Sequence, residues 1–329
     1  MVIDIGKNRQ FVFGSTSSEY AVFSRCLCDN KERKYQSLNT SAGIRVRFST
    51  DSSNVTITFT TRCAEWSSLV GVSLSMGIQY IVKENNSSNG KILNQGLIVA
   101  KSNNTVIEKN IFSNIGKKRC YYELLLPSLG EVTSLFVNID DDSALDIYTY
   151  GNTGKILFLG GPLTLGMGCS FATSMFVNRV SRAMDIDYLN LSFRTNEYLD
   201  PTFINDIAID NYSYIITESA SVGYSVESTK RNLLNYFEEI NKRFNNVPIV
   251  ILSQLFWGDN SNGYREKTAL VQEMFNHYPE IFNKCLYIDG EALMKKEDYD
   301  KYSISLYTLN DNANALIAKN ILKALQFLR

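Results

Sequence analysis

Residues 155–166 read KILFLGGPLTLG, and this stretch decides the fold. Its first half is a solid apolar run, which is typical of a strand buried on both faces of a parallel sheet, and Gly160, Gly161 and Pro162 then predict a tight turn. Proline has neither a hydroxyl group nor a backbone N–H, so Pro162 can neither attack a substrate nor donate a hydrogen bond. The stretch also lacks the lysine of a phosphate-binding loop and the glycine spacing of a dinucleotide site.

Downstream of this stretch, short apolar runs alternate with segments of helical periodicity. The predicted strands cover residues 155–160, 187–193, 212–217, 247–254 and 285–290. The predicted helices cover residues 174–183, 200–209, 226–244, 264–277 and 312–328. Solid strands that alternate with helices indicate a parallel sheet covered by helices on both faces. We expect Leu157, Leu191, Ile215 and Ile251 to lie on its central strands.

Upstream, from residue 41 to about residue 147, the apolar pattern has mostly a period of two. The segments IRVRFST (44–50) and NVTITFTTR (54–62) alternate β-branched or apolar residues with polar ones. This alternation predicts half-buried antiparallel strands, and the turn-rich pieces between them favour a β-sandwich. The sequence therefore predicts a β-sandwich domain over residues 1–150 and an α/β domain over residues 151–329.

Composition narrows the classes of function. The 33 Lys and Arg residues nearly balance the 34 Asp and Glu residues, so there is no overall field that would attract nucleic acid or an anionic membrane. The N-terminus lacks the pattern of a secretory signal, and no window reaches the roughly 18 apolar residues of a membrane span, so we expect a cytoplasmic protein. The six cysteines are scattered, and His277 is the single histidine. We expect no metal and no cofactor.

Several segments resemble the SGNH (GDSL-type) hydrolases, in the layout where a jelly-roll-like β domain precedes the hydrolase domain. In order along the chain, they are residues 41–57, 121–140, 159–170, 189–201, 212–221 and 310–321. The resemblance covers nearly the whole chain. It implies a flavodoxin-like three-layer α/β domain with a parallel sheet, preceded by a jelly-roll-like β-sandwich.

The same resemblance implies where catalytic groups would lie, and most of them are replaced. An SGNH enzyme needs a nucleophilic serine, oxyanion donors from a glycine and an asparagine, and a histidine paired with an aspartate. The corresponding vestigial positions carry the residues Pro162, Thr195, Asn196, Ser221, Ser305 and Thr308, with Arg194 an alternative to Thr195 and Tyr307 an alternative to Thr308. The serine and the histidine are both absent, so no catalytic residue is expected.

Loss of both partners of the proton transfer favours a non-catalytic SGNH-like protein, a pseudo-hydrolase. Such a protein would bind a partner protein or a small acylated or carbohydrate-like ligand through the vestigial cleft. The alternative is a carbohydrate-type esterase or acyltransferase of the SGNH class with substituted catalytic residues. In that case Cys169, near the start of a predicted helix, is the candidate substitute nucleophile. His277 ends a predicted helix, far in sequence from the expected catalytic loop.

The candidates for ligand binding are Gly161, Thr164, Arg194, Asn196 and Glu218. Arg194 and Glu218 bring charge to positions that are usually small or uncharged in the family that the chain resembles. Because a buried charge without a partner is costly, we expect these two side chains either to pair with each other or to contact a ligand.

Overall fold

The computed structural model describes most of the 329 residues. The described ranges are 1–16, 22–25, 38–63, 72–87, 90–194, 199–219, 225–255, 263–305 and 308–326, with Ser305 described by its backbone only. These residues form two compact units. Unit 1 comprises Met1–Thr153, Ser170–Thr173 and Ser181–Leu189, and unit 2 comprises Gly154–Cys169, Ser174–Val180 and Asn190–Arg329. The boundary near residue 150 between two contiguous domains stays a prediction.

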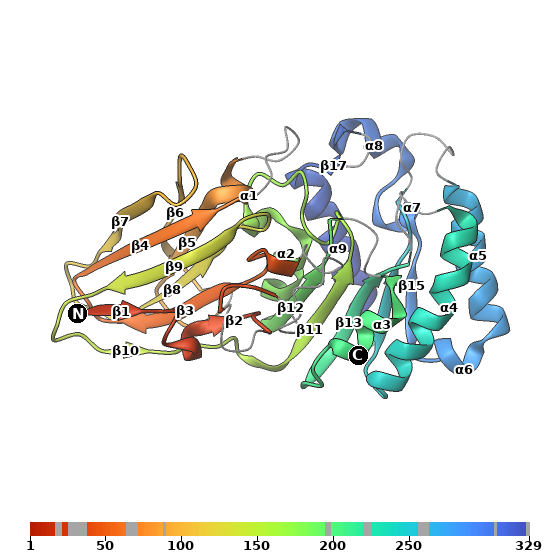
Figure 1. Ribbon diagram of the computed structural model, residues 1–329, viewed down its shortest axis with the longest axis horizontal. Coiled ribbons are helices and arrows are strands. Elements are labelled where there is room, and N and C mark those ends of the chain that lie inside the picture. Colours follow the sequence, from red (N-terminus) through yellow and green to blue (C-terminus); the bar gives the residue numbers. More distant parts are fainter. Residues whose placement is uncertain are drawn as a thin grey trace. The chain divides into compact units, whose positions relative to one another are not determined.

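Unit 1 contains two antiparallel sheets (Figure 1). The first has the order β1 (Val2–Asp4), β9 (Glu131–Asn138), β4 (Asn54–Arg62), β7 (Val106–Ser113). The second has the order β10 (Leu145–Asp146), β3 (Arg45–Thr50), β8 (Cys120–Leu125), β5 (Gly77–Lys83), β6 (Ile92–Val99), and β2 (Val12–Phe13) pairs with β3. The short helix α1 (Val72–Met76) leads into β5.

One hydrophobic core lies between the two sheets. Val55, Ile57 and Phe59 of β4 belong to the same buried cluster as Val46 and Phe48 of β3. Along β4 these buried residues alternate with more exposed ones, as the period of two predicts. The structure therefore confirms that this part of the chain forms two antiparallel sheets around a shared core.

Strand β3 departs from the prediction of a half-buried strand, because all six of its residues are buried. Its polar positions include Arg45 and Arg47, whose side chains have no exposed surface. Both arginines contact Asp187, which lies in the part of unit 1 formed by residues 181–189. The alternation predicts which side chains share a face, but it does not reveal that a distant segment covers the polar face.

A third sheet consists of five strands, and the carboxyl ends of these strands lie in unit 2. Their order is β12 (Ile186–Ser192), β11 (Asn152–Gly160), β13 (Tyr212–Glu218), β14 (Ile249–Leu252), β15 (Cys285–Ile288). In chain order this is 2-1-3-4-5, the order of flavodoxin-like sheets, and β11, β13, β14 and β15 pair in parallel. The four residues predicted for the central strands, Leu157, Leu191, Ile215 and Ile251, are fully buried. Leu157, Ile215 and Ile251 lie on the inner strands β11, β13 and β14, as predicted, whereas Leu191 lies on β12 at the edge of the sheet, so that part of the prediction is wrong.

The five predicted helices are all present, with ends shifted by a few residues. They are α2 (Phe176–Met184), α3 (Pro201–Asp206), α4 (Val226–Arg243), α5 (Tyr264–His277) and α9 (Asp311–Leu325). The sequence analysis missed the short helices α6 (Pro279–Phe282), α7 (Gly290–Leu293) and α8 (Lys296–Tyr302), and the small hairpin of β16 (Ser303–Ser305) and β17 (Thr308–Leu309). Elements this short carry too little periodicity to detect. Within the described ranges, no helix combines the length and the apolar character needed to cross a membrane.

The burial of the parallel strands predicts how truncation of one of their side chains changes the free energy of unfolding. Ile251→Ala should lower the free energy of unfolding by about 2–5 kcal/mol, because the side chain is fully buried in β14 and its removal leaves a cavity. Urea denaturation followed by circular dichroism measures the change. Ile209→Ala is the matched control, since Ile209 is exposed and its truncation should change stability by less than about 0.5 kcal/mol. Equal effects of the two substitutions would contradict the assignment of Ile251 to the core.

Candidate functional site

The turn after β11 places the predicted nucleophile position at the carboxyl edge of the parallel sheet. The Leu165 N–H donates to the Gly161 carbonyl and the Met167 N–H donates to the Pro162 carbonyl, each at 3.0 Å, so the chain coils into a helical turn. Pro162 fits the start of this turn, where a backbone N–H is not needed. Its side chain is half-buried. A ring without a hydroxyl group therefore occupies the position that the resemblance in sequence predicts for the nucleophile.

Two glycines further along this segment set its close contacts. Gly166 and Gly168 have positive φ angles of 79° and 92°, which favour glycine. A Cβ atom on Gly168 would lie 2.4 Å from Cγ2 of Thr308, so this backbone packs directly on the residue predicted to stand at the position of the catalytic histidine. The structure thus brings the segment that follows Pro162 and the segment at Thr308 together. Thr308 itself is buried.

Glu218 holds the turn in place from the end of β13. One carboxylate oxygen, Oε1, accepts hydrogen bonds from the Gly161 N–H at 2.9 Å, from the Thr164 N–H at 3.1 Å and from the Thr164 hydroxyl at 2.6 Å. A Cβ atom on Gly160 would lie 2.5 Å from the same oxygen, so only glycine fits there. Burial raises the pKa of Glu218, while the Thr164 hydroxyl and the two N–H groups act in the opposite direction.

The structure brings three of the five ligand candidates, Gly161, Thr164 and Glu218, into this one group. Arg194 follows β12 and is half-buried. The expected ion pair between Arg194 and Glu218 is not found among the contacts of the described residues, in which Glu218 bonds to the turn instead. A buried carboxylate can be satisfied by N–H and O–H donors without a cation. No motif in the sequence indicates that Glu218 is satisfied in this way.

Several vestigial positions cannot be placed. Thr195, Asn196 and Ser221 lie outside the described residues. Ser305 ends β16 and pairs across the small hairpin with Thr308. The ligand-binding roles of Arg194 and Asn196 stay predictions.

Neither substitute group considered from the sequence has favourable surroundings. Cys169 is buried, and desolvation raises the pKa of its thiol, which disfavours the reactive thiolate. His277 is the last residue of α5, a helix that runs from the carboxyl edge of the sheet towards the start of β15, so it lies near the amino edge. Its Nδ1 atom is 2.9 Å from the Glu273 carbonyl oxygen of the same helix. The structure therefore places His277 away from the turn.

Other polar groups at the same edge were not predicted from the sequence. The Asn190 amide donates to the Thr164 carbonyl at 3.2 Å and also accepts from the Ser192 N–H, and the side chains of Asn190 and Ser192 are buried. Gln254, two residues beyond the end of β14, is buried, and neither of its amide atoms has a hydrogen-bond partner among the described residues. A position just after a parallel strand was the signal that could have found Gln254, whereas Asn190 and Ser192 lie within β12. Among the described residues, no three His, Cys, Asp or Glu side chains cluster as metal ligands.

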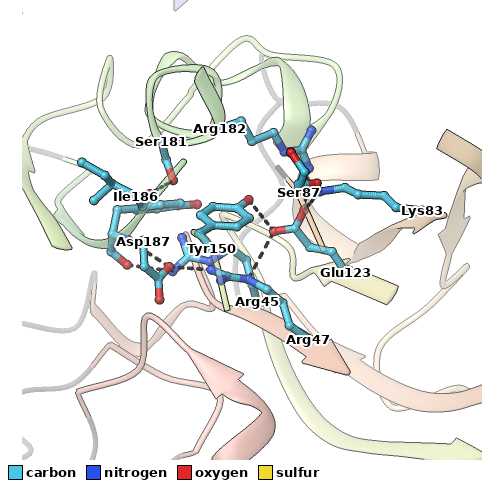
Figure 2. A network of polar contacts seen from close by, with 11 residues as sticks. Arg45, Arg47, Lys83, Ser87, Glu123, Tyr150, Ser181, Arg182, Ile186 and Asp187 are labelled. Carbon is cyan, nitrogen blue, oxygen red and sulfur yellow. Dashed lines mark hydrogen bonds and ion pairs between the residues drawn. The ribbon is translucent and has the colours of Figure 1, made fainter. Parts of the chain in front are cut away.

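A second polar group, in unit 1, was also missed. Figure 2 shows Glu123 of β8 at its centre, where the carboxylate accepts from the Tyr150 hydroxyl at 2.8 Å and from Arg182 Nη2 at 3.0 Å. Arg47 Nε lies 3.4 Å and Lys83 Nζ 3.9 Å from the same carboxylate. Burial pushes the pKa of Glu123 upward, but the three cations outweigh it and lower the pKa to about 2.

Comparison with known proteins gives the fold but no close relative. No protein-family model matches the sequence, and no curated protein matches it. Among solved structures, a protein described as a GDSL-like lipase from Bacteroides ovatus aligns with a TM-score of 0.84 at 14% identity, over 99% of this chain and 98% of that one. The chain has the fold of the GDSL-like lipases. Identity this low shows the fold alone.

Two further structures support the same fold. A salicylyl-acyltransferase from a tetracycline biosynthetic pathway aligns with a TM-score of 0.73 at 16% identity, over 96% of this chain and 95% of that one. A family two carbohydrate esterase from Clostridium thermocellum, solved in complex with cellohexaose, aligns with a TM-score of 0.64 at 12% identity. The alignment covers 87% of this chain and 92% of that one. The resemblance to the SGNH class that the sequence indicated is therefore confirmed for the fold.

The surroundings of Glu218 predict a pH-dependent difference in stability. A raised pKa in the folded state means that folding favours the protonated carboxyl group. This contribution is fully present below the ordinary glutamate pKa and is lost as the pH rises through the folded-state pKa. Relative to Glu218→Gln, the wild-type protein should therefore lose stability as the pH rises above about 4.5. Urea denaturation of both proteins from pH 4 to pH 8 measures this difference, and a constant difference would contradict it.

The contacts of Glu123 with buried cations predict that removal of its negative charge lowers the free energy of unfolding strongly. Glu123→Gln removes the only carboxylate among the described residues that contacts Arg47, Lys83 and Arg182 together, and should cost about 3–5 kcal/mol of unfolding free energy. Glu131→Gln is the matched control, because Glu131 pairs with Arg62 at the surface and its loss should cost at most about 1 kcal/mol. Chemical denaturation distinguishes the two, and similar losses would show that Glu123 is not a buried ion-pair centre.

Proposed function

We propose that this chain is a non-catalytic SGNH-fold protein that binds a ligand or a partner protein at the turn after β11. Pro162 at the nucleophile position carries the proposal. Covalent acyl transfer needs a hydroxyl or thiol group activated by a nearby base. The corresponding base position is Thr308, which cannot accept a proton from a nucleophile near neutral pH.

The surroundings of the turn support this reading. A nucleophile residue in an acyl-transfer site commonly also donates its backbone N–H to the oxyanion, and Pro162 has no N–H. The neighbouring Gly161 N–H already donates to Glu218. A buried carboxyl group beside the turn adds negative charge when ionised, which opposes the charge that develops on an acyl carbonyl oxygen. Each of these changes works against hydrolysis and none disrupts the fold.

Ligand binding would use the polar groups that remain at the carboxyl edge of the sheet, where ligands bind in doubly wound folds. Gly161, Thr164 and Glu218 form the base of this vestigial site, and Arg194 and Asn196 are proposed to contact the ligand. A small acylated or carbohydrate-like molecule and a partner protein are both compatible with this set. No part of the proposal requires a metal or a cofactor.

The alternative is an esterase or acyltransferase with substituted catalytic residues. Its support is that proteins described as a lipase, an acyltransferase and a carbohydrate esterase share the fold over most of their length. Cys169 is the candidate nucleophile for this reading. The burial of Cys169 and the upward shift of its pKa weigh against it.

We also propose that unit 1 is a jelly roll. Strands β1, β9, β4 and β7 form one sheet, and β3, β8, β5 and β6 lie side by side in the other. Between β3 and β9 the chain changes sheet at every connection except the one from β5 to β6. Two four-stranded antiparallel sheets joined by such crossings are the arrangement expected of an eight-stranded jelly roll.

Active-site labelling tests the proposed function. The wild-type protein should show no covalent labelling by a fluorophosphonate probe and no hydrolysis of p-nitrophenyl acetate above the rate of denatured protein. Pro162→Ser should remain unlabelled, because the base position is still Thr308. Stoichiometric labelling of the wild-type protein would overturn the proposal. If the label were mapped to Cys169, the alternative reading would replace it.

A reconstruction provides the positive control. The triple variant Pro162→Ser, Ser305→Asp, Thr308→His introduces the three side chains of the proton-transfer system, and residues 305 and 308 are paired in the backbone register of the hairpin. This variant should gain labelling that Pro162→Ser lacks. Labelling of the single variant alone would show that a base other than residue 308 serves this site.

A further inference from the structure

The polar group in unit 1 contains more positive than negative charge. Its cationic side chains are Arg45, Arg47, Lys83 and Arg182, and the carboxylates in contact with them are Glu123 and Asp187 (Figure 2). Asp185 adds a longer-range influence on Lys83. Arg45, Arg47 and Glu123 have no exposed side-chain surface. An excess of buried positive charge is costly unless something compensates it.

The carboxylates do not use all the donors that the arginines offer. Oδ1 of Asp187 already accepts from Nη2 of Arg45, from Nη2 of Arg47 and from the Tyr188 N–H. Within the described part of the chain, Nε and Nη1 of Arg45, Nη1 of Arg47 and Nε of Arg182 are buried without a hydrogen-bond partner. Arg47 Nε is close enough to Glu123 for an ion pair but is not aligned for a hydrogen bond. Unsatisfied buried donors of this kind destabilise a fold.

Aromatic rings cover the flat faces of the guanidinium groups but do not satisfy their edges. Arg45 lies over the Tyr188 ring at 3.5 Å, and Arg47 lies over Phe13 at 4.3 Å and over Tyr150 at 4.0 Å. Such stacking stabilises the positive charge through the ring face. The N–H bonds of a guanidinium group lie in its plane, so they remain available for an acceptor at the edge.

We propose that Arg45 and Arg47 form a binding site for a small tetrahedral oxyanion, sulfate or phosphate. The two side chains are two residues apart on β3 and therefore point to the same face of the sheet. Paired guanidinium edges match the oxygens of such an anion. The group reaches the surface at Asp187 and Arg182, whose side chains are 14% and 20% exposed. This proposal is independent of the proposed function.

The anion would also connect two parts of unit 1. Arg45 and Arg47 belong to the antiparallel sheet, while Asp187 and Tyr188 belong to the segment 181–189. An anion held by both arginines would reduce the repulsion between them and leave Asp187 free to hold that segment through Nη2 of each arginine. Binding should therefore stabilise unit 1 specifically.

Thermal unfolding of the whole protein tests the site. At constant ionic strength set with sodium gluconate, about 20 mM sulfate or phosphate should raise the melting temperature of the wild-type protein by about 3 °C. Arg45→Met should lose this shift. Arg62→Met, which removes the same charge from a surface pair, should keep it. Equal shifts in all three proteins, or no shift in the wild-type protein, would overturn the proposal.

Two further measurements keep the test decisive. If Arg45→Met does not fold, selenate soaked into wild-type crystals should give an anomalous peak beside Arg45 and Arg47, and a peak elsewhere alone would contradict the site. Phenyl phosphate distinguishes the source of the anion. A shift with inorganic phosphate but none with the ester supports a site for the free ion, and a larger shift with the ester supports a site for a phosphate group on a larger molecule.

Discussion

Parallel strands have their carboxyl ends at the same edge of a sheet, and the candidate site of this protein depends on that constraint. Gly161 follows β11, Arg194 follows β12, and Glu218 ends β13, so residues more than fifty positions apart in the chain come to one edge. The solid apolar strands fix this edge by burying both faces of the sheet. Within the edge, the Gly160–Thr164 turn then takes its shape from the carboxylate of Glu218.

Two buried carboxylates show how surroundings set the behaviour of one residue type. Glu218 is held by N–H and O–H donors, and burial raises its pKa. Glu123 is equally deprived of water, but three cations contact it and its pKa falls to about 2. Burial disfavours the charged form in both cases, and only Coulomb attraction from nearby cations reverses the direction. Glu218 is therefore suited to bracing a turn, whereas Glu123 is suited to holding positive side chains together.

The contacts that hold the turn after β11 also bear on function. A turn that is held by glycines, a threonine and a carboxyl group does not need a hydroxyl group at position 162 to keep its shape. The similarity to proteins described as a lipase, an acyltransferase and a carbohydrate esterase concerns the fold, and a fold by itself does not determine a reaction.

The sequence by itself determined the strand and turn at residues 155–166, the five helices of useful length and the buried central residues such as Ile251, because these features depend on local periodicity. Its resemblance to the SGNH hydrolases also predicts that Pro162 stands at the nucleophile position. Only the tertiary structure decided that Glu218 bonds to the turn rather than to Arg194, and that Arg45 and Arg47 are buried against Asp187. Those contacts join residues as far as 142 positions apart, and a one-dimensional pattern records the polarity of each residue but not what covers it.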